Sequence, residues 1–183
     1  RLLRETVQTK LILEMAATSE MIGIAMEIMP DLVTLVPEKR KELTTEGGLD
    51  LISQQNNIGE AVAALRQAGI PTSIFVNPDP EQIKLAHQIN AAKVEIHTGT
   101  FCDAVTPEKK DQAFSMIVES VKLANRLKLG VHAGHGLCYS TISAFRGLHG
   151  IDEFSIGHSI VSRAALVGME RAVREMRALI QNL

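Results

Sequence analysis

Six short apolar runs recur along the chain, and between them apolar residues follow a helical spacing. The runs are rich in β-branched residues and cover residues 11–16, 32–36, 72–76, 93–97, 129–133 and 153–156. Their length and composition predict strands, and the segments between them predict helices. Because no linker or low-complexity tract intervenes, we predict one α/β domain over residues 1–183, with parallel strands and helical crossovers.

Capping signals mark where several of the helices begin. Thr18, Asp79 and Thr106 are candidate N-caps, and the last two are followed by a proline at the first helical position. Gln82 is placed to complete a capping box with Asp79. A final amphipathic helix is predicted from Ser162 to the C-terminus. The residues expected on its inward face are Leu166, Met169, Val173, Met176 and Ile180.

Polar residues stand at or just past the end of nearly every predicted strand. They are Glu14, Glu38, Asn77, Glu95, His97, His135 and His158. The alternation of strands and helices also fits an open doubly wound sheet, but no Gly-x-Gly-x-x-Gly follows the first strand. Functional groups at strand ends are typical of a TIM (β/α)8 barrel, so this is the fold we predict.

Composition excludes several classes of protein. The chain has 183 residues, of which 45% are hydrophobic and 22% charged, as in a globular domain. A formal net charge of −2 gives no reason to expect nucleic acid or a membrane as a partner, and no apolar stretch approaches the length of a membrane span. Cys102 and Cys138 are too few for a disulfide framework or a zinc site, which favours reduced thiols and a cytoplasmic location.

Two predicted strands carry carboxylates on an otherwise apolar background. Glu14 alternates with Leu13 and Met15, so it occupies the opposite face of its strand. It is expected either to act as an acid or base with a raised pKa, or to pair with a lysine or arginine. Glu95 and His97 share the inward face of their strand. They indicate a site, with a structural Glu–His pair as the alternative.

His135 stands between two glycines at the end of the fifth strand. Such small neighbours let the backbone approach a ligand and leave the imidazole exposed. Histidine titrates near neutral pH and can donate or accept a proton. His132 is expected to pack against a helix instead.

A phosphate site is predicted where the last strand meets the final helix. Gly157 and His158 occupy this junction, and Gly136 lies on the preceding strand end. Barrels bind phosphate at such junctions through backbone N–H groups. No metal is expected, because the sequence has neither His-x-x-x-His nor Cys-x-x-Cys spacing.

Residues 35–50 form a loop after the second strand, rich in charges and ending in a Gly47-Gly48 pair. A mobile loop at the end of a buried strand is a common place for chemistry, although a solvated charged turn is the alternative. This loop and five other segments together resemble the pyridoxine 5′-phosphate synthase family. The segments are 13–16, 35–40, 44–50, 95–99, 133–137 and 156–158, in the family's order and at its spacing across essentially the whole chain.

The resemblance implies a barrel enzyme that condenses 3-amino-2-oxopropyl phosphate with 1-deoxy-D-xylulose 5-phosphate. The products are pyridoxine 5′-phosphate, inorganic phosphate and water, and no cofactor is implied. Glu14 resembles the family's general base and His135 its proton donor. Glu95 resembles the carboxylate that stabilises charged intermediates. Repeated proton transfers of this kind suit carboxylates and imidazole.

The resemblance also assigns the binding residues. Thr44 resembles a ligand of the deoxyxylulose phosphate on a loop that closes over the site, with Gly47-Gly48 as its hinge. Gly136, Gly157 and His158 resemble the cradle for the aminoacetone phosphate. A cytoplasmic homo-oligomer, an octamer in the family, is implied as well.

The sequence departs from the family at the N-terminus, where the family has two further strands. The six predicted strands then correspond to strands three to eight, and we expect the sequence to be part of a longer chain. A truncated chain is the alternative, and we expect it to be inactive or unstable because a sheet edge would stay unpaired. Other functions are a different phosphate-binding barrel enzyme, with Lys39 as the only Schiff-base candidate, or a module that binds phosphorylated metabolites without turnover.

Overall fold

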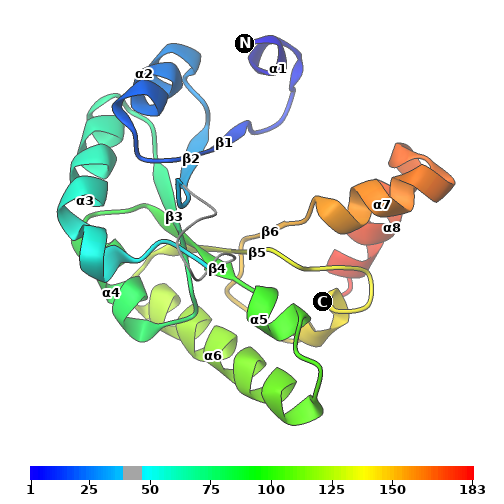
Figure 1. The fold of residues 1–183 in the computed structure, drawn as a ribbon. Helices are drawn as coiled ribbons and strands as arrows, with labels where there is room; N and C mark the ends of the chain where they lie inside the picture. Colours follow the sequence, from blue (N-terminus) through cyan, green and yellow to red (C-terminus); the bar gives the residue numbers. More distant parts are fainter. Residues whose placement is uncertain (39–46) are drawn as a thin grey trace.

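The six predicted strands are all present and form one curled parallel sheet (Figure 1). The computed structural model describes residues 1–38 and 47–183. The strands are β1 (Ile12–Met15), β2 (Leu32–Leu35), β3 (Thr72–Val76), β4 (Lys93–His97), β5 (Gly130–Gly134) and β6 (Glu153–Ser155). Each strand pairs with the next along the chain, so the order is β1-β2-β3-β4-β5-β6. All carboxyl ends therefore lie at the same end of the sheet.

Helices cover the outer side of this sheet (Figure 1). The helices of the described residues are α1 (Leu2–Thr6), α2 (Ser19–Ile28), α3 (Leu51–Gln67), α4 (Pro80–Gln88), α5 (Gly99–Cys102), α6 (Pro107–Arg126), α7 (His158–Val167) and α8 (Met169–Ile180), with a 3-10 turn η1 (Ile142–Phe145). In Figure 1, α2, α3, α4 and α6 follow the convex side in order, as helical crossovers between neighbouring parallel strands require. The opposite, concave side of the sheet is left free of these helices.

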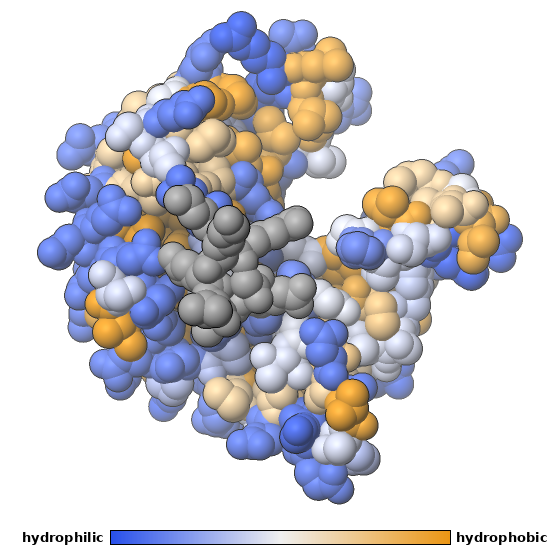
Figure 2. All heavy atoms as spheres, viewed as in Figure 1, coloured by the Kyte–Doolittle hydropathy of each residue, from blue (hydrophilic) through white to orange (hydrophobic). Residues whose placement is uncertain are grey.

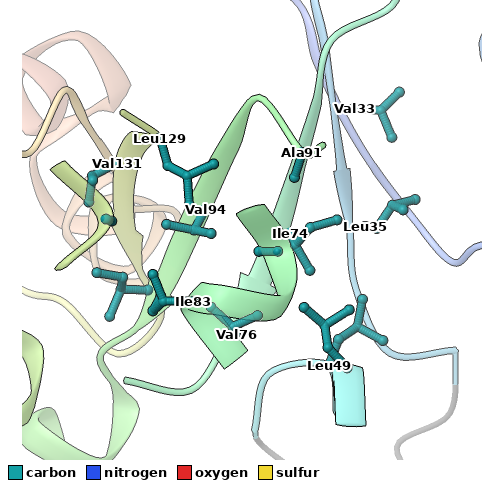
Figure 3. Close-up of a cluster of buried hydrophobic side chains, with 14 of the residues drawn as sticks. Val33, Leu35, Leu49, Ile74, Val76, Ile83, Ala91, Val94, Leu129 and Val131 are labelled. Atoms are coloured by element: carbon teal, nitrogen blue, oxygen red, sulfur yellow. The ribbon is translucent and has the colours of Figure 1, made fainter. Parts of the chain in front are cut away.

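The hydrophobic core lies between the convex side of the sheet and the helices (Figure 3). Alternate strand residues point into it, and those that are at most 1% exposed include Val33, Leu35, Ile74, Val76, Val94, Ile96 and Val131. Helix α6 contributes an apolar stripe, in which Ile117, Val121 and Ala124 are buried. The strand residues between these core positions face the concave side, where the candidate chemistry lies.

The three predicted N-caps are confirmed, because each side chain accepts a hydrogen bond from a backbone N–H of the first helical turn. The predicted role of Gln82 is wrong. Its side chain leaves its own helix, accepts a hydrogen bond from Leu51 N at 2.8 Å and donates one to Asp50 Oδ1 at 3.1 Å. Gln82 therefore joins the first turns of α3 and α4, a contact between segments that local spacing does not reveal.

The single C-terminal helix is also a wrong prediction. Two helices, α7 and α8, meet at Gly168, whose backbone has a φ of 85°. A left-handed residue breaks the helix, so one apolar stripe cannot continue across it. Three of the five residues expected to face inward are exposed, namely Leu166 (82%), Met169 (53%) and Val173 (45%). Met176 is buried, and Ile180 packs against the core.

Two expectations from composition can be compared with this structure. In the part of the chain that the structure describes, no helix is both long enough and apolar enough to cross a membrane. Cys102 and Cys138 are free thiols, each partly exposed.

Candidate active site

An open cavity of about 980 Å³ lies at the carboxyl ends of the strands, on the concave side of the sheet. In the space-filling view the molecule is hollowed between the N-terminal helices and α7 (Figure 2). The cavity is lined by Glu14, Val36, Phe75, Glu95, Asp103, His135, Gly136, Leu137, Ser155, Ile156, Gly157, His158 and Ser159. Its walls thus come from the ends of β1 to β6 and from the loops that follow them.

Six of the seven predicted site residues lie in this lining. They are Glu14, Glu95, His135, Gly136, Gly157 and His158. The seventh, Thr44, lies outside the described residues, and so does Lys39. Parallel strands bring their carboxyl ends together, which is why residues far apart in the sequence meet here.

Glu14 is exposed on the concave face of β1 rather than buried. It lies opposite Thr34 of β2 in the sheet register. Among the described residues, no lysine, arginine or histidine forms an ion pair with Glu14. The ion pair expected as one alternative is therefore absent there, and the carboxylate faces the cavity without a partner from this part of the chain.

Glu95 occupies the same kind of position on β4 but is buried, with 5% of its surface exposed. Burial raises the pKa of the Glu95 carboxyl to about 7, the negative charge of Glu14 adds to the rise, and the Ser155 hydroxyl opposes it. A carboxyl with this pKa can donate or accept a proton near neutral pH. Room for it depends on Gly134 of β5, where a Cβ atom would lie 2.4 Å from Glu95 Oε1.

His135 has an unusual backbone, with a φ of 77° in the left-handed region. This conformation is costly for a residue with a side chain and is common at functional sites. Thr98 holds it with two donors: its hydroxyl donates to the His135 carbonyl at 2.5 Å, and its backbone N–H donates to the Gly134 carbonyl at 2.8 Å. Gly136 follows with a φ of 75°. The result is an exposed imidazole on a backbone that is fixed from beneath.

His97 lies behind His135 and does not line the cavity. It is 4% exposed, and its ring centroid is 4.9 Å from that of His135 and 5.4 Å from that of Phe75. Burial lowers the pKa of His97 to about 4. The neighbouring His135 also lowers this pKa, and Asp103 raises it by a smaller amount. The alternative of a Glu95–His97 hydrogen-bonded pair is wrong, because neither ring nitrogen of His97 has a hydrogen-bond partner in the described structure.

The first turn of α7 forms one wall of the cavity through Gly157, His158 and Ser159. Among residues 1–38 and 47–183, no side chain caps this helix by a hydrogen bond. The Ser159 hydroxyl donates to the Leu137 carbonyl at 2.9 Å, which ties this turn to the loop after β5. An uncapped helix N-terminus presents free N–H groups and a positive partial charge, the requirements for binding an anion.

The predicted place of His132 is wrong. Its strand register sets it between Glu95 and Glu153, on the face opposite Val131 and Ala133, which pack toward the helices. Its Nε2 atom is 3.9 Å from Glu153 Oε2, and burial lowers the pKa of the ring. The prediction failed because it counted alternation from His135, which stands beyond the end of β5 where alternation no longer holds.

The end of the loop at 35–50 is held against β3. Gly48 N donates to Asn77 Oδ1 at 3.0 Å, and Leu49 N donates to the Phe75 carbonyl at 2.7 Å. A Cβ atom on Gly48 would lie 2.4 Å from Val76 Cα, so only glycine fits this close approach. Residues 39–46 lie outside the described part, and the closing loop and its hinge stay predictions.

Four polar or aromatic lining residues were not anticipated, namely Phe75, Asp103, Ser155 and Ser159. Phe75 and Ser155 carry a usable signal, because each shares the inward parity of its strand. Asp103 follows the short helix α5 and has no such signal. Within residues 1–38 and 47–183, no cluster of three or more histidine, cysteine or acidic side chains has the geometry of a metal site.

Comparison with known proteins identifies this arrangement. Residues 1–182 match the family model described as pyridoxal phosphate biosynthesis protein PdxJ. The chain belongs to this family. Pyridoxine 5′-phosphate synthase of Desulforapulum autotrophicum is 60% identical over 183 residues, covering 100% of this chain and 77% of its own length. The protein of the same name from Syntrophobacter fumaroxidans is 54% identical over 180 residues, or 98% of this chain and 76% of its own length.

Proposed function

We propose that this PdxJ-family chain catalyses the synthesis of pyridoxine 5′-phosphate, as the names of its relatives indicate for those proteins. The substrates would be 3-amino-2-oxopropyl phosphate and 1-deoxy-D-xylulose 5-phosphate. The observation that carries the proposal is the meeting of Glu14, Glu95 and His135 in one cavity whose wall is an uncapped helix N-terminus. Acid/base groups and an anion site are what a condensation of two phosphorylated substrates requires.

Different environments suit the two carboxylates to different roles. Glu14 is exposed and acts as the general base that removes protons from the bound substrates. Glu95 is buried with a pKa of about 7, so it can stabilise the charge that develops on an intermediate by gaining or losing its proton. His135 extends its imidazole into the cavity and donates the proton that a leaving hydroxyl or phosphate needs.

The phosphate of the aminoacetone substrate binds at the first turn of α7. Gly157 and His158 provide backbone N–H groups there, and an added Cβ atom on Gly157 would meet nothing within 4 Å, so the approach is open. Gly136 faces the same wall from the loop after β5. Thr44, on the loop outside the described residues, would bind the deoxyxylulose phosphate.

We further propose that the curled sheet is strands three to eight of an eight-stranded (β/α)8 barrel, in a cytoplasmic homo-oligomer. The sequential strand order and the helices on one side support this reading. The relatives are also longer, since this chain spans about three quarters of their length (77% and 76%). Intact-mass measurement of the native protein tests it, because a mass of 19.9 kDa would leave only six strands.

The activity is tested by mixing the full-length native protein with both substrates and following the absorbance of pyridoxine 5′-phosphate. Glu14→Gln and His135→Asn should each lower kcat by about 100-fold or more with the fold intact. Glu60→Gln and His87→Asn are matched controls on exposed faces of α3 and α4, and they should keep full turnover. A folded wild-type protein that forms no product would refute the proposal.

The same assay separates the alternatives. A Schiff-base aldolase needs a lysine in its site, and none lies in the cavity lining formed by the described residues. A metabolite-binding module would bind phosphate without turnover. It would not need Glu14, Glu95 and His135 together, so the joint loss of turnover in the variants argues for the enzyme.

A further inference from the structure

We propose that His97 is a positioning residue for His135, its imidazole packed behind the ring of His135 so that His135 keeps one orientation toward the cavity. The proposal deepens the proposed function, since it concerns the residue placed there as proton donor. His97 is not in the cavity lining and so has no direct role in binding. Its contacts assign it a supporting one.

The burial of His97 needs an explanation. The side chain is 96% buried, because only 4% of its surface is exposed, and both ring nitrogens lack a hydrogen-bond partner in the described structure. Burying polar nitrogens in this way costs stability relative to an apolar side chain of similar size. The side chains that the flat ring packs against explain why a histidine is buried here in spite of this cost.

The rings form a compact stack. The His97 and His135 ring centroids are 4.9 Å apart with the planes tilted by 39°, and the Phe75 ring lies nearly perpendicular to that of His97, with the centroids 5.4 Å apart. Phe75 also reaches His135 at 6.5 Å. His135 is therefore exposed on the cavity side and covered on the other by two buried or half-buried rings.

The two residues after His97 complete the support. Thr98 donates its hydroxyl to the His135 carbonyl, which holds the left-handed backbone in place. Gly99 leaves the gap that both rings need, since a Cβ atom there would lie 2.7 Å from His97 Nε2 and 3.0 Å from His135 Cδ2. Three consecutive residues thus support His135: His97 packs against its ring, Thr98 binds its carbonyl, and Gly99 leaves the space that its ring needs.

The distance between the two imidazoles also limits the charge that they can carry. Two cationic imidazoles 4.9 Å apart would repel, and the buried one is the harder to protonate. The titratable groups that act on His97 are His135, which disfavours its protonation, and Asp103, which favours it less strongly. His97 therefore stays neutral, packed behind the ring that faces the cavity.

The test compares three forms of the full-length protein. His97→Leu fills the space without a flat face and should lower kcat by about 10-fold while the KM of each substrate changes less than about 3-fold. His97→Phe restores a flat, neutral ring and should recover most of the lost kcat. A kcat for His97→Leu within 2-fold of wild type overturns the proposal. Equal losses in both variants with an unchanged His135 ring would instead assign chemistry to the His97 nitrogens.

A second readout needs no substrate and so separates this proposal from the proposed function. In protein with ¹³C-labelled histidine, the Cε1–Hε1 signal of His135, assigned with His135→Asn, should be single in wild type and broadened or split in His97→Leu. The His97 signal should not titrate between about pH 5.5 and 8. Titration of His97 in that range contradicts the neutral pair. If His97→Leu does not fold, Gly99→Ala, which crowds both rings, must shift the His135 signal.

Discussion

The two ends of the concave face contain the same residue types in opposite electrostatic situations. At the amino end, Glu153 lies beside buried His132 and receives a hydrogen bond from Lys10 at 2.5 Å. At the carboxyl end, Glu95 and His97 are buried without an ion-pair partner among the described residues. An ion pair such as that of Glu153 stabilises the fold. A titratable side chain that is buried without such a partner has a shifted pKa instead, as is common for groups that transfer protons.

The pKa shifts express this difference. The Lys10 hydrogen bond lowers the pKa of Glu153, whereas burial raises that of Glu95 to about 7. Both glutamates belong to the concave face of the same sheet, and their strands are separated only by β5. The sign of the shift is therefore set by the lysine, not by the strand.

Glu95→Gln should lower kcat by about 100-fold or more, because an amide cannot gain or lose the proton that the buried carboxyl does. The fold should persist, since no ion pair to Glu95 is broken within the described structure. Glu153→Gln, at the other end of the concave face, should keep normal turnover. Steady-state kinetics decides the comparison, and normal turnover in Glu95→Gln would remove the proposed role.

Gly134→Ala should lower kcat by about 10-fold or more by displacing the Glu95 carboxylate, since the new Cβ atom would lie 2.4 Å from Oε1. Gly23→Ala is the control, because its Cβ atom would meet nothing within 4 Å in α2. It should raise stability slightly, as alanine favours helices more than glycine does. Equal activity of the two variants would show that turnover does not depend on where the Glu95 carboxylate lies.

Stability should change with pH in opposite directions when Glu95 or His97 is removed. Native Glu95 keeps its proton up to about pH 7, whereas the unfolded residue loses it near 4.5, so its burial costs more as pH rises between these values. Unfolded His97 binds a proton below about pH 6.5, but the native ring binds one only below about pH 4, so its burial costs less as pH rises. The two slopes overlap and oppose each other in wild type.

Chemical denaturation from pH 4 to 8 measures these slopes. Relative to wild type, Glu95→Gln should gain up to about 3 kcal/mol of unfolding free energy as pH rises through 4.5–7. His97→Leu should change by a similar amount with the opposite slope over pH 4–6.5. Parallel curves for all three proteins would mean that neither group has a displaced pKa.

Glu153→Gln should have only a small effect, a lowering of Tm by at most about 3 °C near neutral pH, because its ion pair with Lys10 is largely solvated. The pKa of Glu153 is lowered in the folded protein, so its contribution is present above pH 4.5 and is lost as pH falls through the folded pKa. Glu119→Gln, which breaks the more exposed pair with Lys122, should change Tm even less. A larger change in Tm would place a structural role at the amino end.

Much of the fold could be predicted from local sequence. The six strands and the three N-caps depend on residues that are close together in the sequence, and these predictions are confirmed. The errors fall where a contact crosses the chain or the backbone leaves regular geometry. Gln82 reaches α3 over a separation of 31 residues, and Gly168 breaks the last helix with a positive φ. Neither event has a signal in the apolar spacing.

The candidate site divides in the same way. Strand ends and glycine neighbours were enough to predict six residues that line the cavity. They were not enough to distinguish Glu14 from Glu95, which share a strand pattern although one is exposed and the other buried. The support of His135 by His97 was equally hidden, because it needs two strands to bring the two imidazole rings within 5 Å of each other.

The sequence by itself therefore determined the strands, the helix starts and the end of the sheet at which chemistry gathers, because alternation and capping are local rules. Only the tertiary structure decided which carboxylate is buried, which histidine is exposed and which charges find a partner. Those properties depend on solvent exclusion and on contacts such as that of Lys10 with Glu153, 143 residues apart. Proton affinity at this site is accordingly a property of the folded sheet rather than of any one segment.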